Sequence, residues 1–307
     1  MSLSELNLFP LCLGGNVFGW TADREASFAV LDAYAEAGGN FVDTADSYSH
    51  WIPGHVGGES ETVVGEWMAS RRNRDQIMVA TKVGMLPDRA GLSAANIRAA
   101  VEDSLRRLGT DHIDLYWAHI DDAEVPLEET LGAFDALVRE GKIRNIGASN
   151  YEAARLAEAL EISEREGLAR YGVVQQQYNL VERGYEGALR DVVAGAGLTS
   201  TPYYGLARGF LTGKYRPGVD VDSPRAGKAS AYLATERGPR ILDALDKVAA
   251  AHGAVPATIA LAWLAAQPTV AAPIASARNV EQLRPLLAVA EVELTEDELA
   301  LLEEASR

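Results

Sequence analysis

The feature that most constrains the fold is a regular alternation between short apolar segments and longer segments with helical periodicity. Near the start, an apolar segment around Leu11 precedes residues 23–37, whose apolar side chains recur at helical spacing. Gly38 and Gly39 end this predicted helix, and a short predicted strand at residues 40–42 follows. Strands that alternate with helices in this way pair in parallel through right-handed crossovers.

The same unit recurs to the end of the chain. Strands are predicted near Leu11, at 40–42, near Met78, near Ile113, and at 143–148, 173–177, 198–203 and 270–274. Helices are predicted at 23–37, 59–70, 93–108 (capped by Ser93), 127–140, 151–166, 185–194, 240–251, 256–267, 280–289 and 296–304, with a long loop at 205–239. Eight strands, each followed by a helix, favour one α/β domain over residues 1–307, a (β/α)8 TIM barrel. A small N-terminal hairpin at Leu6–Leu11 and extra C-terminal helices complete the prediction.

The alternative, an open doubly wound sheet, lacks its usual signature. No Gly-x-Gly-x-x-Gly follows the first predicted strand, because residues 14–19 read Gly-Gly-Asn-Val-Phe-Gly. A dinucleotide, if one binds, is therefore not expected to bind as it does in that fold.

Composition excludes several classes of function. The chain has 44 acidic and 28 basic residues and a formal net charge of −16, so its surface repels phosphate backbones and no nucleic-acid partner is expected. Cys12 is the only cysteine, and the five histidines show no ligand spacing, so neither a disulfide nor a metal site is predicted. No signal peptide and no apolar run of membrane-spanning length are evident. We therefore expect a cytoplasmic protein without a membrane partner.

Four ionisable residues follow predicted strands in chain order. Asp43 ends the strand at 40–42, Tyr48 lies five residues later in a polar loop, and Lys82 and His119 follow the next two strands. The carboxyl ends of all strands in a parallel barrel open onto one face, where the loops build the active site. Each residue alone also suits a turn cap, a solvated strand end or simple packing, but together they are predicted to converge.

This set of four suits the reduction of a carbonyl group. A free tyrosine has a pKa of about 10, and we expect Lys82 to lower the pKa of Tyr48. Asp43 would hold Lys82 charged and in place, and His119 could orient a carbonyl oxygen by hydrogen bonding. Such a group can donate a proton to an oxygen that acquires negative charge.

Longer motifs carry a resemblance to a known family. They are Asn-Phe-Val-Asp-Thr-Ala-Asp-Ser-Tyr at 40–48, Gly-Glu-Ser-Glu at 58–61, Ala-Thr-Lys at 80–82, Asp-Leu-Tyr-Trp-Ala-His at 114–119 and Gly-Lys-Ile-Arg-Asn-Ile-Gly-Ala-Ser-Asn at 141–150. Together with residues 175–180, 202–215 and 277–278, they make the chain resemble the aldo-keto reductases over essentially its whole length. The resemblance implies that Tyr48 is the proton donor, that Lys82 and Asp43 support it, and that His119 orients the substrate.

The resemblance also implies NADPH/NADP+ as cofactor and a small-molecule aldehyde or ketone as substrate. Ser149, Asn150 and Gln175 would bond the carboxamide, and Tyr203 would stack under the nicotinamide ring. The remaining matches are Leu206, Arg208, Gly209 and Lys214 over the pyrophosphate, and Ser276, Ala277, Arg278 and Gln282 at the adenosine phosphate. The guanidinium of Arg278 suits a 2′-phosphate.

Two departures from the family pattern concern the cofactor end. Tyr204-Gly205 stands where members often have Ser-Pro, and Pro285-Leu286 replaces a common Glu-Asn whose Asn contacts adenine. Trp20 and Trp51 are predicted pocket walls, because tryptophan offers a large apolar face.

Two other functions stay open at this point. A barrel lysine such as Lys82 can form a Schiff base, as in aldolases, although a paired Asp43 would keep the amine protonated. Some proteins that resemble this family are non-catalytic nicotinamide-sensing regulatory subunits. The sequence identifies neither the particular carbonyl substrate nor the oligomeric state.

Overall fold

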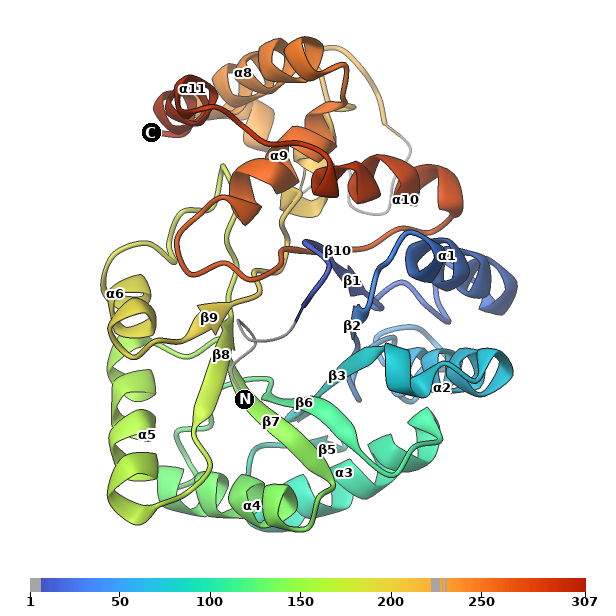
Figure 1. Cartoon of the computed structure of the whole chain (residues 1–307), viewed down its shortest axis with the longest axis vertical. Coiled ribbons are helices and arrows are strands. Elements are labelled where there is room, and N and C mark those ends of the chain that lie inside the picture. Colours follow the sequence, from blue (N-terminus) through green and yellow to red (C-terminus); the bar gives the residue numbers. More distant parts are fainter. Residues whose placement is uncertain (1–6, 222–226, 228, 230) are drawn as a thin grey trace.

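Eight parallel strands form one curved sheet at the centre of the protein (Figure 1). The computed structural model describes residues 7–221, 227, 229 and 231–307. In spatial order the strands are β10 (Ile274–Ala275), β1 (Cys12–Gly14), β2 (Phe41–Asp43), β3 (Met78–Val83), β6 (Ile113–Ala118), β7 (Ile143–Ser149), β8 (Tyr171–Gln175) and β9 (Thr199–Ser200). Apart from β10, this order follows the chain, as expected when a helix joins each strand to its neighbour.

Hydrogen bonds between the two ends of the sheet close it into a barrel. Ser200 in β9 forms a parallel bridge with Val270, and its backbone N donates to the carbonyl oxygen of Thr269 at 2.7 Å. Farther along, the backbone N of Ile274 donates to the carbonyl oxygen of Pro202 at 2.9 Å. The predicted (β/α)8 barrel is thereby confirmed.

Helices surround the barrel on its outer side (Figure 1). Those that join consecutive strands are α1 (Arg24–Glu36), α2 (Glu59–Arg71), α3 (Ala94–Leu108), α4 (Leu127–Arg139), α5 (Ala153–Glu166) and α6 (Ala188–Gly195). Later come α8 (Arg237–His252), α9 (Pro256–Ala265), α10 (Val280–Leu287) and α11 (Glu296–Ser306), with short 3-10 helices η2 (Arg74–Gln76), η3 (Ala207–Thr212), η4 (Ala231–Ala234) and η5 (Ala288–Ala290). Ser93 caps α3 as predicted, because its hydroxyl accepts a hydrogen bond from the backbone N of Asn96.

Among the described helices, none alone is long and apolar enough to cross a membrane. Only α8 and α9 taken together, which bend by 95° at their junction, reach the required length and composition.

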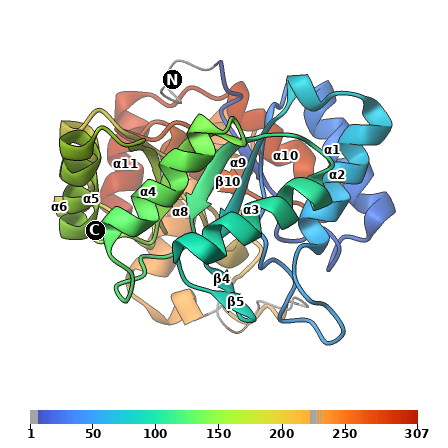
Figure 2. The same ribbon diagram turned by 90° about the horizontal axis from the view of Figure 1, so that it is seen from below.

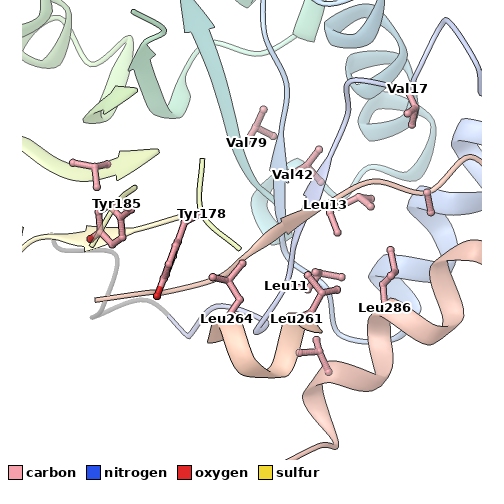
Figure 3. Close-up of a cluster of buried hydrophobic side chains, with 14 of the residues drawn as sticks. Leu11, Leu13, Val17, Val42, Val79, Tyr178, Tyr185, Leu261, Leu264 and Leu286 are labelled. Atoms are coloured by element: carbon pink, nitrogen blue, oxygen red, sulfur yellow. The ribbon is translucent and has the colours of Figure 1, made fainter. Parts of the chain in front are cut away.

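Apolar side chains on the two faces of the strands form two layers of core. The inner layer fills the barrel and consists of Cys12, Phe41, Ala80, Leu115, Trp117, Val173, Ala272 and Ile274. The outer layer lies between strands and helices. Figure 3 shows part of it, with Leu13 of β1, the preceding Leu11, and Leu261 and Leu264 of α9 in one cluster. Successive residues of a strand point to opposite faces, so the two layers alternate along each strand.

Several local predictions differ from the structure. The predicted N-terminal hairpin falls partly on residues 1–6, which lie outside the described residues, and residues 7–11 are not in a strand. An unpredicted antiparallel hairpin, β4 (Met85–Leu86) with β5 (Arg89–Ala90), follows β3 and projects from the same end of the barrel as the loop between β2 and α2 (Figure 2). Within the predicted loop at 205–239, η3 and η4 are present and α8 begins at Arg237.

Candidate active site

The alternation of side chains along β2 and β3 turns two of the predicted catalytic residues into the barrel. Phe41 belongs to the inner layer and Val42 to the outer layer, so Asp43 points inward again. On β3, Ala80 belongs to the inner layer, and Lys82 follows it two residues later. The sequence predicted that Lys82 follows a strand. In the structure Lys82 lies within β3, because pairing with β6 continues to the end of β3.

The ammonium group of Lys82 is fully buried and held by three oxygen atoms. Nζ donates to the carboxylate of Asp43, to the carbonyl oxygen of Thr44 at 2.8 Å and to the hydroxyl oxygen of Tyr48 at 2.8 Å. The hydroxyl of Tyr48 donates to Oδ2 of Asp43 at 3.4 Å, and Nε2 of Gln175 donates to Oδ1 of Asp43 at 3.1 Å. The structure thus brings the predicted Asp, Lys and Tyr into one hydrogen-bonded group.

The electrostatics of Tyr48 differ from the prediction. Burial raises the pKa of Tyr48 well above its ordinary value, and the negative charge of Asp43 raises it further. The prediction that Lys82 lowers the pKa of Tyr48 is therefore wrong as a net effect. The loss of water around a phenolate raises this pKa by more than Lys82, which is shared with Asp43, can lower it. Burial also lowers the pKa of Lys82, and Asp43 opposes that change. Tyr48 consequently keeps its proton throughout the physiological pH range.

His119 reaches the same place from the end of β6. Its ring centroid lies 6.1 Å from that of Tyr48, with the ring planes at 75°. Burial lowers the pKa of His119 well below its ordinary value, and the charge of Lys82 acts in the same direction, so the imidazole is neutral at pH 7. Within the described part of the chain, Nδ1 is buried without a hydrogen-bond partner. A neutral imidazole on the cavity wall can donate one hydrogen bond to a bound oxygen.

These side chains surround a cavity of about 760 Å³. The predicted site residues that line it are Trp20, Asp43, Tyr48, Trp51, His119, Ser149, Asn150, Gln175, Tyr203, Leu206, Arg208, Gly209, Lys214, Ser276, Arg278 and Gln282. Lys82 and Ala277 are fully buried and do not line it. Ala277 packs in the outer core layer, so its side chain is not available to a ligand.

One wall of the cavity carries the amide-bearing side chains at the ends of β7 and β8. Nδ2 of Asn150 donates to the carbonyl oxygen of His119 at 2.9 Å and to Oγ of Ser149 at 3.1 Å. The hydroxyl of Tyr203 donates to Oδ1 of Asn150 at 2.8 Å. Because Nε2 of Gln175 is engaged with Asp43, its Oε1 is left as an acceptor at the cavity.

The segment after β9 adopts a left-handed backbone at several residues that are not glycine. Tyr204, Ala207 and Arg208 have φ values of 54°, 48° and 59°, and Gly209 follows with 96°. Each such non-glycine residue costs about 1–3 kcal/mol and persists only where the surroundings hold it, typically at binding sites. The guanidinium of Arg208 lies 4.7 Å from the ring centroid of Tyr204, and Lys214 lines the cavity nearby. Two cations on such a tight loop suit an anionic ligand.

The opposite end of the cavity is built by the segment between β10 and α10. Oγ of Ser276 donates to Oδ1 of Asn16 at 2.7 Å, and the backbone N of Arg278 donates to Oε1 of Gln282 at 3.1 Å. Asn279 caps α10 by accepting from the backbone N of Gln282 at 2.9 Å. The side chain of Arg278 is half-buried at the cavity wall, beside the helix N-terminus.

The aromatic end of the cavity includes residues that the sequence did not single out. Trp20 and Trp51, the predicted walls, meet edge to face at 5.6 Å between ring centroids, and Trp51 is 46% exposed. His50 and Met85 line the cavity beside them. Met85 belongs to β4, and the Pro-Asp pair at 87–88 in the following turn was an available hairpin signal. For His50, the only signal in the sequence was its closeness to Tyr48 in the same polar loop.

A second buried carboxylate lies two residues before Tyr48. Both carboxylate oxygens of Asp46 are buried and have no hydrogen-bond partner among the described residues. Nearby Glu61 is also fully buried, but it accepts hydrogen bonds from Thr81 and Arg107. Burial, followed by the charge of Glu61, raises the pKa of Asp46 to about 7.

Comparison with known proteins identifies the family of the chain. The sequence model described as the aldo/keto reductase family matches residues 10–307. Norsolorinic acid reductase stcV of Emericella nidulans is 33% identical over 98% of this chain and 79% of its own, and protein tas of Escherichia coli is 33% identical over 98% and 94%. The NADP(+) aryl-alcohol dehydrogenase of Phanerodontia chrysosporium is 29% identical over 97% and 82%. The chain is an oxidoreductase that belongs to the aldo/keto reductase family.

Proposed function

We propose that the protein reduces a small-molecule aldehyde or ketone to the alcohol with NADPH, and that Tyr48 donates the proton. The observation that carries this proposal is the hydrogen-bonded group of Lys82, Asp43 and Tyr48 at a cavity that His119 also lines. Asp43 and Lys82 are hard to explain as packing, because a buried ion pair is often no more stable than apolar residues of similar volume. A set that keeps a proton beside a fixed cation suits general acid catalysis.

The chain's own residues handle the carbonyl oxygen and the proton. A bound nicotinamide would supply the hydride that adds to the carbonyl carbon. Neutral His119 donates a hydrogen bond to the carbonyl oxygen and fixes its position. As that oxygen acquires negative charge, Tyr48 transfers its proton to it. Lys82, 2.8 Å from the phenolic oxygen, then stabilises the phenolate, and Asp43 keeps Lys82 in place.

The donor set of the cavity fits a nicotinamide dinucleotide phosphate. Oε1 of Gln175 and the hydroxyl of Ser149 offer an acceptor and a donor for a carboxamide. Arg208 and Lys214 on the left-handed segment suit a pyrophosphate, and Arg278 suits a 2′-phosphate, which a planar guanidinium can bind through two hydrogen bonds. The name of the Phanerodontia relative includes NADP(+), which supports the same choice.

The burial and the ion pair of Lys82 argue against a Schiff-base mechanism. A nucleophilic lysine must be neutral and must reach the substrate. Lys82 is fully buried, does not line the cavity and is bonded to a carboxylate. A regulatory subunit without catalysis would not need Tyr48 and His119 at a cavity of this size, so no observation favours that reading.

The experiment is a panel of aldehydes and ketones assayed by the loss of NADPH absorbance, run beside borohydride treatment with mass spectrometry. We expect stoichiometric alcohol formation with NADPH consumption and no substrate mass added to the protein by borohydride. A covalent adduct at Lys82 would contradict the proposal and support the aldolase. Tight NADPH binding without turnover of any panel member would instead support a sensing subunit.

A further inference from the structure

The side chain of His50 is held in one tautomer by the backbone. Its Nδ1 lies 2.6 Å from the carbonyl oxygen of Ser47, one turn earlier in the same loop. A carbonyl oxygen can only accept a hydrogen bond, so Nδ1 must carry the hydrogen. In the neutral imidazole, Nε2 is then a hydrogen-bond acceptor.

This acceptor is placed at the aromatic end of the cavity. His50 lines the cavity together with Trp20 and Trp51, and its ring centroid lies 5.3 Å from that of Trp51 at an interplanar angle of 82°. No described residue hydrogen-bonds to Nε2 of His50, and the atom is not sealed in the core. A ligand in the cavity can therefore reach it.

The surroundings define the group that would fit beside His50. Trp20, Trp51 and Met85 offer apolar surface, and edge-to-face packing against indole favours a flat aromatic ring. The basic residues of the lining, Arg208, Lys214 and Arg278, come from the segments at the other parts of the cavity, which suit the cofactor. What His50 offers beside the tryptophans is Nε2, and a ring nitrogen that accepts a hydrogen bond recognises a hydroxyl hydrogen.

We propose that His50 determines specificity by accepting a hydrogen bond from a ring hydroxyl, so that the preferred substrates are hydroxylated aromatic aldehydes or ketones. This inference rests on the proposed function, because it assumes that the carbonyl lies at Tyr48 and His119. His50, Tyr48 and His119 line the same cavity, so one bound substrate can contact the proton donor and the acceptor together. A substrate whose hydroxyl is replaced by a methyl ether loses the donor and leaves Nε2 without a partner.

The test compares hydroxybenzaldehydes with their methoxybenzaldehyde counterparts, substituted at the second, third or fourth ring position, with NADPH in excess. We expect at least one hydroxy compound to exceed its methoxy counterpart in kcat/KM by roughly tenfold, the usual size of one hydrogen bond to a polar site. His50→Phe keeps a ring of similar size but removes both nitrogens. It should reduce that ratio roughly tenfold by lowering kcat/KM for the hydroxy compound. Because the ratio is taken for both proteins, differences in intrinsic reactivity between the compounds cancel.

His55→Phe is the matched control, since His55 lies in the same loop but does not line the cavity. This variant should keep the preference of the parent protein. If the parent reduces the methoxy and hydroxy compounds equally well, or if His50→Phe keeps the preference, His50 is not the acceptor, although the proposed reduction stands. If none of the compounds is reduced while NADPH still binds, the proposed function itself fails. Should His50→Phe lose secondary structure by circular dichroism, His50→Leu, which also has no hydrogen-bond acceptor in its side chain, replaces it with the same expected ratio.

Discussion

The floor and the rim of the cavity are built in different ways. The floor is the hydrogen-bonded group of Asp43, Tyr48 and Lys82, whose two charged members are buried on neighbouring strands. The rim is formed by residues 204–214 and 276–286, which carry Arg208 and Arg278 at the cavity on segments outside the regular strands. Strand register fixes the floor, whereas left-handed backbone and helix caps shape the rim.

This difference separates the reaction from the choice of ligand. Groups on the floor are desolvated and depend on each other, so the removal of one charged member leaves the opposite charge buried without a partner. Groups on the rim are partly exposed and act on the ligand one at a time. Substitutions of the charged residues on the floor should therefore reduce turnover and stability, and substitutions on the rim should change only which ligand binds.

The largest effect is expected from Lys82→Met, which removes the cation but keeps the length of the side chain. Asp43 would be left buried without its partner, a change that costs about 3–5 kcal/mol of unfolding free energy. Turnover should fall by at least about 10³-fold, because the phenolate of Tyr48 loses its stabilising charge. Urea unfolding and kcat with the best panel aldehyde measure the two effects. Exposed Lys247→Met on α8 is the control, and a Lys82→Met protein that keeps full stability and activity would remove the distinction between floor and rim.

An intermediate effect is expected at Asp46, the buried carboxylate two residues before Tyr48. Its folded pKa of about 7 exceeds the ordinary value of 3.8 for an unfolded chain, so folding favours the protonated acid. That contribution to stability is complete below pH 4 and is lost as the pH rises through 7. A difference of about three pH units, at about 1.4 kcal/mol each, gives an upper limit of roughly 4 kcal/mol.

Asp46→Asn, which cannot ionise, should therefore be more stable than the parent at pH 8. Between pH 4 and 8, its unfolding free energy should fall less than that of the parent. Unfolding free energies at several pH values measure this. Exposed Asp243→Asn serves as the control and should leave the parent's pH dependence unchanged. If Asp46→Asn follows the parent at every pH, Asp46 is not a destabilising buried acid.

The smallest effect is expected on the rim, from Arg278→Ala. One hydrogen-bonded contact to a charged phosphate is worth about 1.5–3 kcal/mol, so KM for NADPH should rise roughly tenfold or more. KM for NADH should change less than about twofold, and the unfolding free energy should stay the same. Arg284→Ala is the control, since Arg284 lies on the same helix, α10, but does not line the cavity. An equal rise of KM for both cofactors would contradict a contact to the 2′-phosphate.

The floor was readable from the sequence for a physical reason. A carboxylate and a lysine that follow inward-facing apolar residues at a spacing of two must point into a parallel barrel, and strand order then places them together. The net direction of the pKa of Tyr48 was not readable, because it depends on how completely the phenol is buried. Sequence order alone reveals charged neighbours but not the loss of water.

The rim was less predictable because loops carry no periodic signal. The matched motif identified Arg208 and Gly209. The left-handed backbone of Tyr204 and Ala207 was not predictable, because neither residue is a glycine. Met85 came to the cavity on a hairpin too short for a strand pattern, and His50 was one of five scattered histidines. Their roles follow from side-chain contacts, which only the folded chain defines.

The most direct test of the account is kcat of Tyr48→Phe with the best panel aldehyde. This change removes one oxygen atom, and the ion pair between Lys82 and Asp43 should preserve the fold and NADPH binding. Loss of a general acid lowers rates by about 10²–10⁴-fold, and we expect a decrease at least that large, with NADPH affinity within about twofold of the parent. A Tyr48→Phe protein that binds NADPH normally and still reduces the aldehyde within a few-fold of the parent rate would show that Tyr48 is not the proton donor.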